Sequence, residues 1–333
     1  MIIETKDPSI AGRLLICGMG SIGRRHARVI HQSWPGIELA VVRSGQGPDY
    51  PELSLMSHQF SDLDAAIAWK PDAAVIASPA PFHQQQALAL AKHRISILIE
   101  KPVGTGGESP EAWDELLELS DNVLMLVGYV LRHDPCAAHV KQKLQSKELG
   151  RILEADFYCG SWLPEWRPNT DYRDSVSGQQ SLGGGVLLEL SHELDLARWL
   201  LGEFELSSAS LRKSGLLEVD VEDQAILVGR SDSCSLITIR LNFCTQPSRR
   251  SVVMRCERGE LRWDLLSGDV NVLIVDQLVQ SYQSGLVGDD RFRLQAEHFM
   301  ACMAGDERPC CSLYDGLQIL KTINKAKTKS VIQ

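Results

Sequence analysis

The segment RLLICGMGSIGRRHARVIHQ, residues 13–32, decides the fold of the first part of this chain. An apolar run leads into a turn with three glycines, and apolar residues at helical spacing follow the turn. The glycines fit G-x-G-x-x-G between a predicted strand and a predicted helix, which is the context in which the motif has meaning. The first permits a tight turn, the second lets backbone approach a pyrophosphate, and the third lets helix and strand pack closely. We therefore expect a dinucleotide to be bound by Gly18, Met19, Gly20, Ser21, Ile22 and Gly23.

Strands and helices alternate up to about residue 130. ELAVVRS (38–44), DAAVIASPAP (72–81), SILI (96–99) and NVLMLVGYV (122–130) are apolar runs typical of buried strands, and amphipathic segments separate them. Strands that are apolar throughout and alternate with helices predict a parallel sheet covered on both faces. Right-handed crossovers then give a doubly wound sheet.

After residue 150 the pattern changes. Runs such as SLITIRLNF (235–243) and SVVMRCE (251–257) alternate apolar and polar residues, which predicts antiparallel strands with one free face. One long helix is predicted over GGGVLLELSHELDLARWLLG (183–202). The sequence thus predicts an α/β protein with an N-terminal Rossmann domain over 1–130. An α+β domain with a large open, mostly antiparallel sheet follows over 131–333, and its final helices could pack on either domain.

The bulk composition limits the function. A chain of 333 residues is long enough for two domains, and its net charge of −9 argues against binding nucleic acid or an anionic membrane. No apolar run is long enough to span a bilayer, and the N-terminus does not look like a secretory signal. The nine cysteines have no metal-like spacing. We expect a cytoplasmic protein with reduced thiols and no metal.

The end of the second predicted strand bears on the cofactor. A carboxylate there would bind a free ribose 2′-hydroxyl, but this strand ends in Val42, Arg43 and Ser44. A guanidinium and a hydroxyl suit a 2′-phosphate, so NADP(H) is favoured over NAD(H). The alternative is that Arg43 stacks on adenine and tolerates both cofactors.

Five segments together resemble one family, the Gfo/Idh/MocA oxidoreductases, and the resemblance covers nearly the whole chain. It implies a Rossmann domain, then a domain built on a large open sheet. It also implies hydride transfer between a nicotinamide cofactor and a sugar, cyclitol or related alcohol or carbonyl. The segments are GMGSIGRRH (18–26), ASPAPFHQQQALALA (77–91), EKPVG (100–104), GYVLRHDP (128–135) and the predicted helix over 183–202.

Lys101 follows a buried strand, where the ligand crevice of a doubly wound sheet lies. A lysine there stabilises a developing alkoxide. We expect Lys101 to be catalytic and, with Glu100, to contact the cofactor. The resemblance also implies a cis peptide bond before Pro102. The alternative is a solvated loop lysine.

His192 lies after three glycines, and an imidazole near neutrality suits acid/base work on a hydroxyl. Glu189, His192 and Asp195 would share one face of a continuous helix. The family has an aspartate four residues before the histidine, where this chain has Leu188. We expect catalytic roles for His192 and Glu189. The alternative for His192 is a structural histidine of the core.

Further site residues are predicted from loops. Ser78, Pro79 and His83 resemble the family's loop beside the nicotinamide ribose. Aromatic rings and guanidiniums suit a sugar that carries an anionic group, although the segment over 161–175 could equally cover the sheet or meet another subunit. The substrate is expected to contact Tyr129, Arg132, Trp166, Arg167, Tyr172, Arg173 and Asp195.

These residues predict an NAD(P)-dependent oxidoreductase acting on a sugar, sugar acid, nucleotide sugar or cyclitol. One rival is a non-catalytic NADPH-binding sensor on the same fold. Another is an imine or enone reductase. The free face of the second sheet is expected to be apolar, which predicts a homodimer or homotetramer formed through it.

Overall fold

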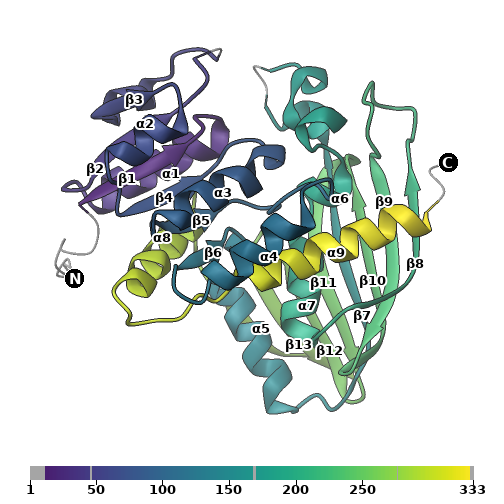
Figure 1. The fold of residues 1–333 in the computed structure, drawn as a ribbon. Helices are drawn as coiled ribbons and strands as arrows, with labels where there is room; N and C mark the ends of the chain where they lie inside the picture. The colour runs from purple at the N-terminus through teal and green to yellow at the C-terminus, as the bar shows by residue number, and fades with distance from the viewer. Residues whose placement is uncertain (1–11, 46, 168–169, 276, 331–333) are drawn as a thin grey trace. The chain divides into compact units, whose positions relative to one another are not determined.

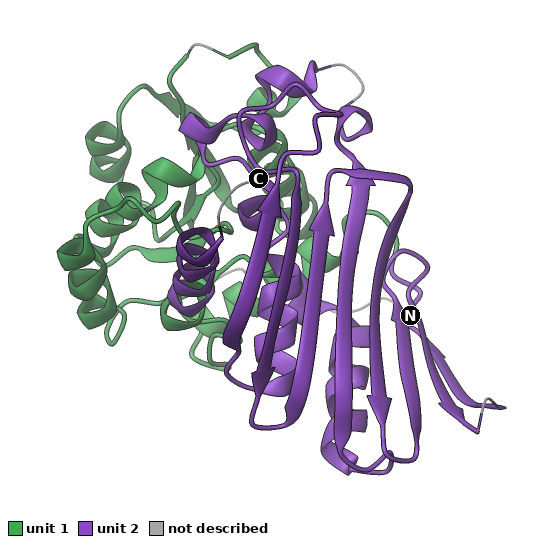
Figure 2. Cartoon of the chain, turned by 90° about the vertical axis from the view of Figure 1, so that its right-hand side faces the viewer, with its two compact units in different colours: residues 1–130, 287–316 green, residues 131–286, 317–333 purple. Residues whose placement is uncertain are grey.

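The computed structural model describes residues 12–45, 47–167, 170–275 and 277–330. The N-terminal segment 1–11, where we expect no secretory signal, lies outside these ranges. The chain divides into two compact units, coloured separately in Figure 2. The first unit comprises 1–130 and 287–316, and the second comprises 131–286 and 317–333.

The first unit is built on a six-stranded sheet in the order β3-β2-β1-β4-β5-β6, in which every pairing is parallel (Figure 1). The predicted doubly wound sheet is therefore confirmed. The chain order reverses beside β1, which is where such sheets bind their ligands. Only β3 was not predicted, because it is short and lacks an apolar run. The strands are β1 (Arg13–Cys17), β2 (Glu38–Val42), β3 (His58–Phe60), β4 (Ala73–Ile76), β5 (Ser96–Ile99) and β6 (Met125–Val127).

Helices connect these strands, and one more helix comes from late in the chain. Asp62 and Ser109 cap α2 and α4 by accepting backbone N–H groups. The late helix α8 packs against α1, and the guanidinium of Arg25 lies over the ring of Phe292. The helices are α1 (Ser21–Ser33), α2 (Leu63–Ala68), α3 (His83–Lys92), α4 (Pro110–Leu119) and α8 (Asp290–Met303).

The second unit is built on an eight-stranded sheet in the order β14-β13-β12-β11-β7-β10-β9-β8. Among the described strands only β7 and β10 pair in parallel, so the predicted mostly antiparallel sheet is confirmed. The strands are β7 (Ile152–Trp162), β8 (Glu205–Arg212), β9 (Gln224–Ser231), β10 (Cys234–Asn242), β11 (Cys244–Cys256), β12 (Gly259–Asp264), β13 (Asp269–Ile274) and β14 (Gln277–Gln283).

Helices cover one face of this sheet. α5 (Pro135–Ser146), α6 (Val186–Glu189) and α7 (His192–Leu201) all contact its strands. α9 (Leu313–Lys329) begins in the first unit, and its later residues belong to the second. Along most of these strands, every second side chain points toward the helices and is buried. In β10, for example, the side chains at 237, 239 and 241 are fully buried.

The opposite face of the sheet is turned to the viewer in Figure 2, and it carries many charged side chains. The guanidinium of Arg255 on β11 forms ion pairs with Glu154 and Asp156 of β7. Arg240 and Arg249 flank the ring of Tyr158. This face is less apolar than predicted, because the residues that alternate with the buried ones are mostly charged or hydroxylated and pair across strands. Apolar residues remain on it, such as Ile226, which is 47% exposed and pairs with Arg240.

The prediction of one long helix over 183–202 was also wrong in one respect, since the structure has two helices in this segment. α6 ends at Glu189, and Leu190 leaves the helical region with φ −101° and ψ 30°. α7 begins at His192 after Ser191. Glu189 and His192 therefore do not share the face of one continuous helix, whereas His192 and Asp195 do lie within one helix.

Candidate functional site

The glycine turn after β1 has the geometry that each glycine was predicted to supply. Gly18 has φ +97°, and a Cβ there would lie 2.9 Å from the backbone of Ser78. A Cβ at Gly23 would lie 2.1 Å from the carbonyl oxygen of Gly18. At Gly20, by contrast, a Cβ would meet no atom within 4 Å. Gly18 and Gly23 are thus required by the fold, while Gly20 leaves open space beside the turn.

The start of α1 suits an anion. Gly20 is its N-cap and supplies no side chain to cap the helix, and the first turn contains no acidic residue. The positive end of the helix dipole and the N–H groups of the first turn are therefore available to a phosphate. The open space at Gly20 and this helix start together fit a dinucleotide pyrophosphate.

Arg43, at the tip of β2, is engaged with the loop that follows it. Its guanidinium donates to the carboxylate of Asp49 at 2.8 Å and to the carbonyl oxygens of Gly47 and Pro48. Ser44 beside it is exposed. Asp49 is 89% exposed, so its bond to Arg43 is open to exchange with a ligand anion.

The loop after β4 is tied to the segment after β5 by His83. The ring nitrogens Nε2 and Nδ1 lie 2.7 Å and 2.9 Å from the carbonyl oxygens of Ser78 and Pro102. Carbonyl oxygens only accept, so the ring holds both bonds only when it is doubly protonated. Burial lowers the pKa of His83, against the raising influence of the two carbonyls and of Glu100 and Glu108. Pro79 precedes a 3₁₀ turn and shapes the loop.

Lys101 is half-buried directly after β5, and the Lys101–Pro102 peptide bond is cis, as the resemblance implied. Glu100 is only 5% exposed. Its carboxylate contacts Nε2 of His26 at 2.7 Å and the N–H of Lys101 at 3.2 Å. The side chain of Glu100 is thus held inside the unit, and its predicted cofactor contact stays a prediction. Sequence reasoning missed His26, although a histidine on the apolar face of α1 signals a buried polar partner.

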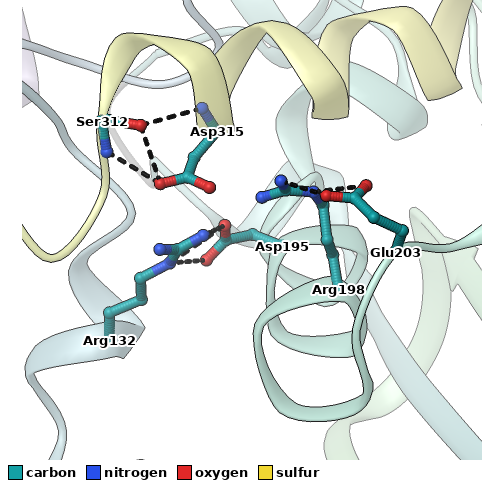
Figure 3. Close-up of polar contacts among 6 residues, drawn as sticks. All are labelled: Arg132, Asp195, Arg198, Glu203, Ser312 and Asp315. Carbon is teal, nitrogen blue, oxygen red and sulfur yellow. Dashed lines mark hydrogen bonds and ion pairs between the residues drawn. The ribbon is translucent and has the colours of Figure 1, made fainter. Parts of the chain in front are cut away.

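In the second unit, His192 is the half-buried first residue of α7. Asp195, in the same first turn, accepts from Nε and Nη2 of Arg132, and the closest of these contacts is 2.6 Å (Figure 3). The side chains of Arg132 and Asp195 are 2% and 1% exposed. Both were predicted to contact substrate. Each is buried against the other, and together they fix the turn that carries His192, while their contact with substrate stays a prediction.

A second, part-buried ion pair holds the same turn of α7, and no pattern in the sequence indicated it. Nε of Arg250 on β11 donates to Oε1 of Glu193 at 2.6 Å. Glu193 follows His192 directly and is 1% exposed. Arg250 stands in an isolated Arg-Arg pair, which is typical of a solvated surface rather than of a buried partner. Two acids in the first turn also suit the positive end of α7.

Glu189 lies at the end of α6 and is half-buried. Oε2 of Glu189 accepts from the hydroxyl of Ser177 at 3.1 Å, and the same hydroxyl lies 3.4 Å from Nη1 of Arg167. Arg167, Ser177 and Glu189 thus form one polar chain. Leu188, which stands where the family has aspartate, is 1% exposed and belongs to the core.

Glu222 fixes the start of α6 from behind. Its Oε1 accepts the N–H of Leu187 at 3.2 Å, and its backbone carbonyl accepts that of Val186. A Cβ at Gly185 would lie 2.6 Å from Oε1, and Gly185 has φ +109°. Burial raises the pKa of Glu222. The last glycine of the GGG run is therefore required by this buried carboxylate, which sequence reasoning missed.

The other predicted substrate residues have partners within their own unit. Tyr129 is 1% exposed. Trp166 donates to the hydroxyl of Ser161 at 2.7 Å, and the hydroxyl of Tyr172 accepts the N–H of Glu218. Arg173 forms ion pairs with Asp171 and Glu218 at the surface, and it lowers the pKa of Asp171 to about 2.

Neither a cluster of metal ligands nor a membrane-spanning helix is present in the described part of the chain. No group of three or more histidine, cysteine, aspartate or glutamate side chains there could hold a metal ion. No helix in the same ranges is long and apolar enough to cross a membrane.

Comparison with known proteins identifies the family. Residues 13–129 match the family described as "Oxidoreductase family, NAD-binding Rossmann fold", and residues 137–262 match the GFO/IDH/MocA C-terminal domain. The chain belongs to the Gfo/Idh/MocA family. Its first unit therefore carries the family's NAD-binding Rossmann domain, and the resemblance found in the sequence is confirmed.

Curated relatives in the family are dehydrogenases. The chain is 28% identical over 237 residues to inositol 2-dehydrogenase 2 of Saccharopolyspora erythraea, which is 68% of this chain and 65% of that protein. It is 29% identical over 210 residues to levoglucosan dehydrogenase of Pseudarthrobacter phenanthrenivorans, which is 59% of this chain and 53% of that protein. The matches thus span between half and two thirds of these relatives.

Solved structures share the fold. The WlbA dehydrogenase from Bordetella pertussis, in complex with NADH and UDP-GlcNAcA, has a TM-score of 0.76 at 22% identity, covering 95% of each chain. An NAD-binding oxidoreductase from Klebsiella pneumoniae has a TM-score of 0.80 at 17% identity, covering 95% of this chain and 96% of that one. At these identities the likeness concerns the fold alone.

Proposed function

We propose that this protein is an NAD(P)-dependent oxidoreductase. It would transfer a hydride between nicotinamide and an alcohol or carbonyl of a sugar, sugar acid, nucleotide sugar or cyclitol. The observation that carries the proposal is the half-buried Lys101, fixed through Glu100 at the carboxyl end of β5. It stands on the sheet edge where β1 leads into the glycine turn. Relatives named as inositol and levoglucosan dehydrogenases support the substrate class.

In this proposal each side chain has one task. The ammonium of Lys101 stabilises the negative charge that develops on the substrate oxygen. The imidazole of His192 takes up the proton of that hydroxyl, or returns it in the reverse direction. Glu189, with Arg167 and Ser177, orients substrate hydroxyls rather than His192, because it ends a separate helix. A bound nicotinamide would supply the hydride donor or acceptor.

The test is a screen of NADPH and NADH oxidation, and of NADP and NAD reduction, against polyols, sugars and nucleotide sugars. Gly20→Val is the matched negative control. Its side chain would enter space that no protein atom occupies, so the fold should survive. The same space is where the pyrophosphate would lie, so dinucleotide affinity should be lost. A wild-type protein without turnover on any of these substrate classes would refute the proposed reaction.

For the cofactor we propose a preference for NADP(H). A 2′-phosphate would replace the exposed carboxylate of Asp49 as the partner of Arg43. We expect Arg43→Asp to reverse the preference and Asp49→Asn to raise NADPH affinity. Arg13→Gln, which removes an arginine at the other end of the sheet, should change neither. Equal titration curves for NADPH and NADH with the wild-type protein would contradict the preference.

We also propose that the chain forms a homodimer or homotetramer through the free face of the second sheet. Because that face carries ion pairs rather than apolar residues, association should weaken as salt rises. Arg255→Glu should weaken it further, and light scattering at micromolar concentration measures both. None of the nine cysteines, all of which the structure describes, forms a disulfide, which supports a cytoplasmic location.

A further inference from the structure

Helix α1 carries a buried histidine whose ring contacts the residue before Lys101. Nε2 of His26 lies 2.7 Å from Oε1 of Glu100, and the two residues are 1% and 5% exposed. An ionised carboxylate only accepts hydrogen bonds, so His26 donates through Nε2. A buried bond to a charged acceptor is among the stronger hydrogen bonds in proteins. It links the helix that follows the glycine turn to the end of β5.

The second oxygen of Glu100 faces the backbone of Lys101. Oε2 accepts the N–H of Lys101 at 3.2 Å. A glycine stands behind this oxygen, since a Cβ at Gly128 would lie only 3.0 Å from it. The carboxylate of Glu100 is therefore confined between the ring of His26, the backbone at Gly128 after β6 and the N–H group of Lys101.

The ring of His26 is itself fixed by packing. It meets the ring of Phe292 on α8 with centroids 5.6 Å apart and planes at 83°, an edge-to-face contact. α8 packs along α1 in the same unit. His26 therefore cannot turn away from Glu100 without disturbing the contact between these two helices.

We propose that His26 is a positioning residue that fixes Lys101 through the carboxylate of Glu100. The inference rests on the hydride-transfer function proposed above, in which Lys101 touches the reacting oxygen and His26 does not. A lysine head on a flexible stem depends on a fixed backbone. Misplacing a catalytic group by about 1 Å can lower the rate about 10²-fold. Loss of His26 should therefore lower kcat and leave dinucleotide binding intact.

The first experiment compares three variants of the full chain. His26→Leu removes the donor, His26→Gln keeps an N–H group, and His31→Gln changes a half-exposed histidine of the same helix. We expect His26→Leu to lower kcat between about 10-fold and 10²-fold, with dinucleotide Kd unchanged. His26→Gln should recover most of the loss, and His31→Gln should match the wild type. A folded His26→Leu protein with wild-type kcat would overturn the proposal.

A double-mutant cycle tests whether the effect passes through Glu100. His26→Leu and Glu100→Gln act in series in this proposal, so the double variant should lose no more than the worse single variant. A double variant that loses the product of the two single losses would show that His26 acts by another route.

A third measurement does not need turnover. Lysine side chains are labelled by reductive ¹³C-methylation, and the Lys101 signal is assigned from its absence in Lys101→Arg. The signal should move in His26→Leu and stay in place in His31→Gln. Should His26→Leu fail to fold, His26→Asn, which is too short to reach Glu100, takes its place. An inactive wild type would refute the proposed reaction alone, while an unmoved Lys101 signal would refute the positioning role.

Discussion

The surroundings of Lys101 and His192 differ in kind. Lys101 follows a strand and is fixed through its neighbours, because Glu100 and Pro102 on either side contact His26 and His83. His192 instead starts a ten-residue helix whose first turn is held by two ion pairs, each with a buried acid. Those pairs are Asp195 with Arg132 and Glu193 with Arg250.

The difference predicts different failures. Loss of a histidine beside Lys101 removes one hydrogen bond, and the strand still holds the segment. Loss of one charge beside His192 leaves its partner buried without compensation, which strongly destabilises a protein. Substitutions beside Lys101 should therefore lower kcat more than the free energy of unfolding. Substitutions of the charges beside His192 should lower the free energy of unfolding more than kcat.

The largest effect is expected from the two reacting groups themselves. Lys101→Ala and His192→Ala should each lower turnover by about 10²–10⁴-fold, the usual contribution of positioned acid/base groups. Cofactor affinity should barely change, because we propose that the Gly18–Gly23 turn, and not these side chains, binds the pyrophosphate. Steady-state kinetics and a cofactor titration measure the two quantities separately.

The double variant sharpens this prediction. It should lose less than the product of the two single losses, since groups that act as one unit are not additive. Full turnover by Lys101→Ala on a genuine substrate would remove the lysine from the mechanism and make it a structural residue.

The next effect separates buried from exposed ion pairs. Asp195→Leu should lower the free energy of unfolding by about 3–5 kcal/mol, because Arg132 would stay buried without its partner. Glu203→Gln is the matched control, since its ion pair with Arg198 has an acid that is 64% exposed (Figure 3). It should lower stability by no more than about 1 kcal/mol. Urea unfolding measures both, and equal losses would contradict the comparison.

A smaller effect is expected at Glu189. Glu189→Gln should lower kcat/KM about tenfold, the kinetic equivalent of about 1.4 kcal/mol, which is one ordinary hydrogen bond. The acid limb of the pH–rate profile should stay in place, because Glu189 and His192 lie on separate helices. A shifted limb would restore Glu189 as the acid that orients His192.

The smallest effect is a pH dependence of stability from His83. Burial lowers the pKa of its ring below the value of 6.5 expected in the unfolded chain. Below that pH the unfolded chain binds a proton more readily than the folded one, so unfolding becomes easier as pH falls. One such group gives a slope of at most about 1.4 kcal/mol per pH unit. His83→Gln should flatten the slope measured by urea unfolding between pH 7 and 5, and an unchanged slope would exclude His83 as its source.

Prediction from sequence succeeded where a local feature of the backbone requires one type of residue. Gly18 and Gly23 are needed by a tight turn and a close approach, and the apolar strands of the first unit admit only a covered parallel sheet. It failed where two distant segments meet. The helix breaks between Glu189 and His192 without a proline or glycine that would indicate the break. The Arg132–Asp195 pair joins residues that are 63 positions apart in the sequence.

The sequence alone therefore determined the two sheets, the dinucleotide turn and the candidates Lys101 and His192, because periodicity and glycine geometry are local properties of the chain. The partners of the polar residues, by contrast, became known from the folded structure. Arg132 and Asp195 could have faced a sugar as well as each other, and Glu100 could have faced a cofactor as well as His26. A buried charge must find a partner, and which partner it finds depends on the packing of elements that the sequence places far apart.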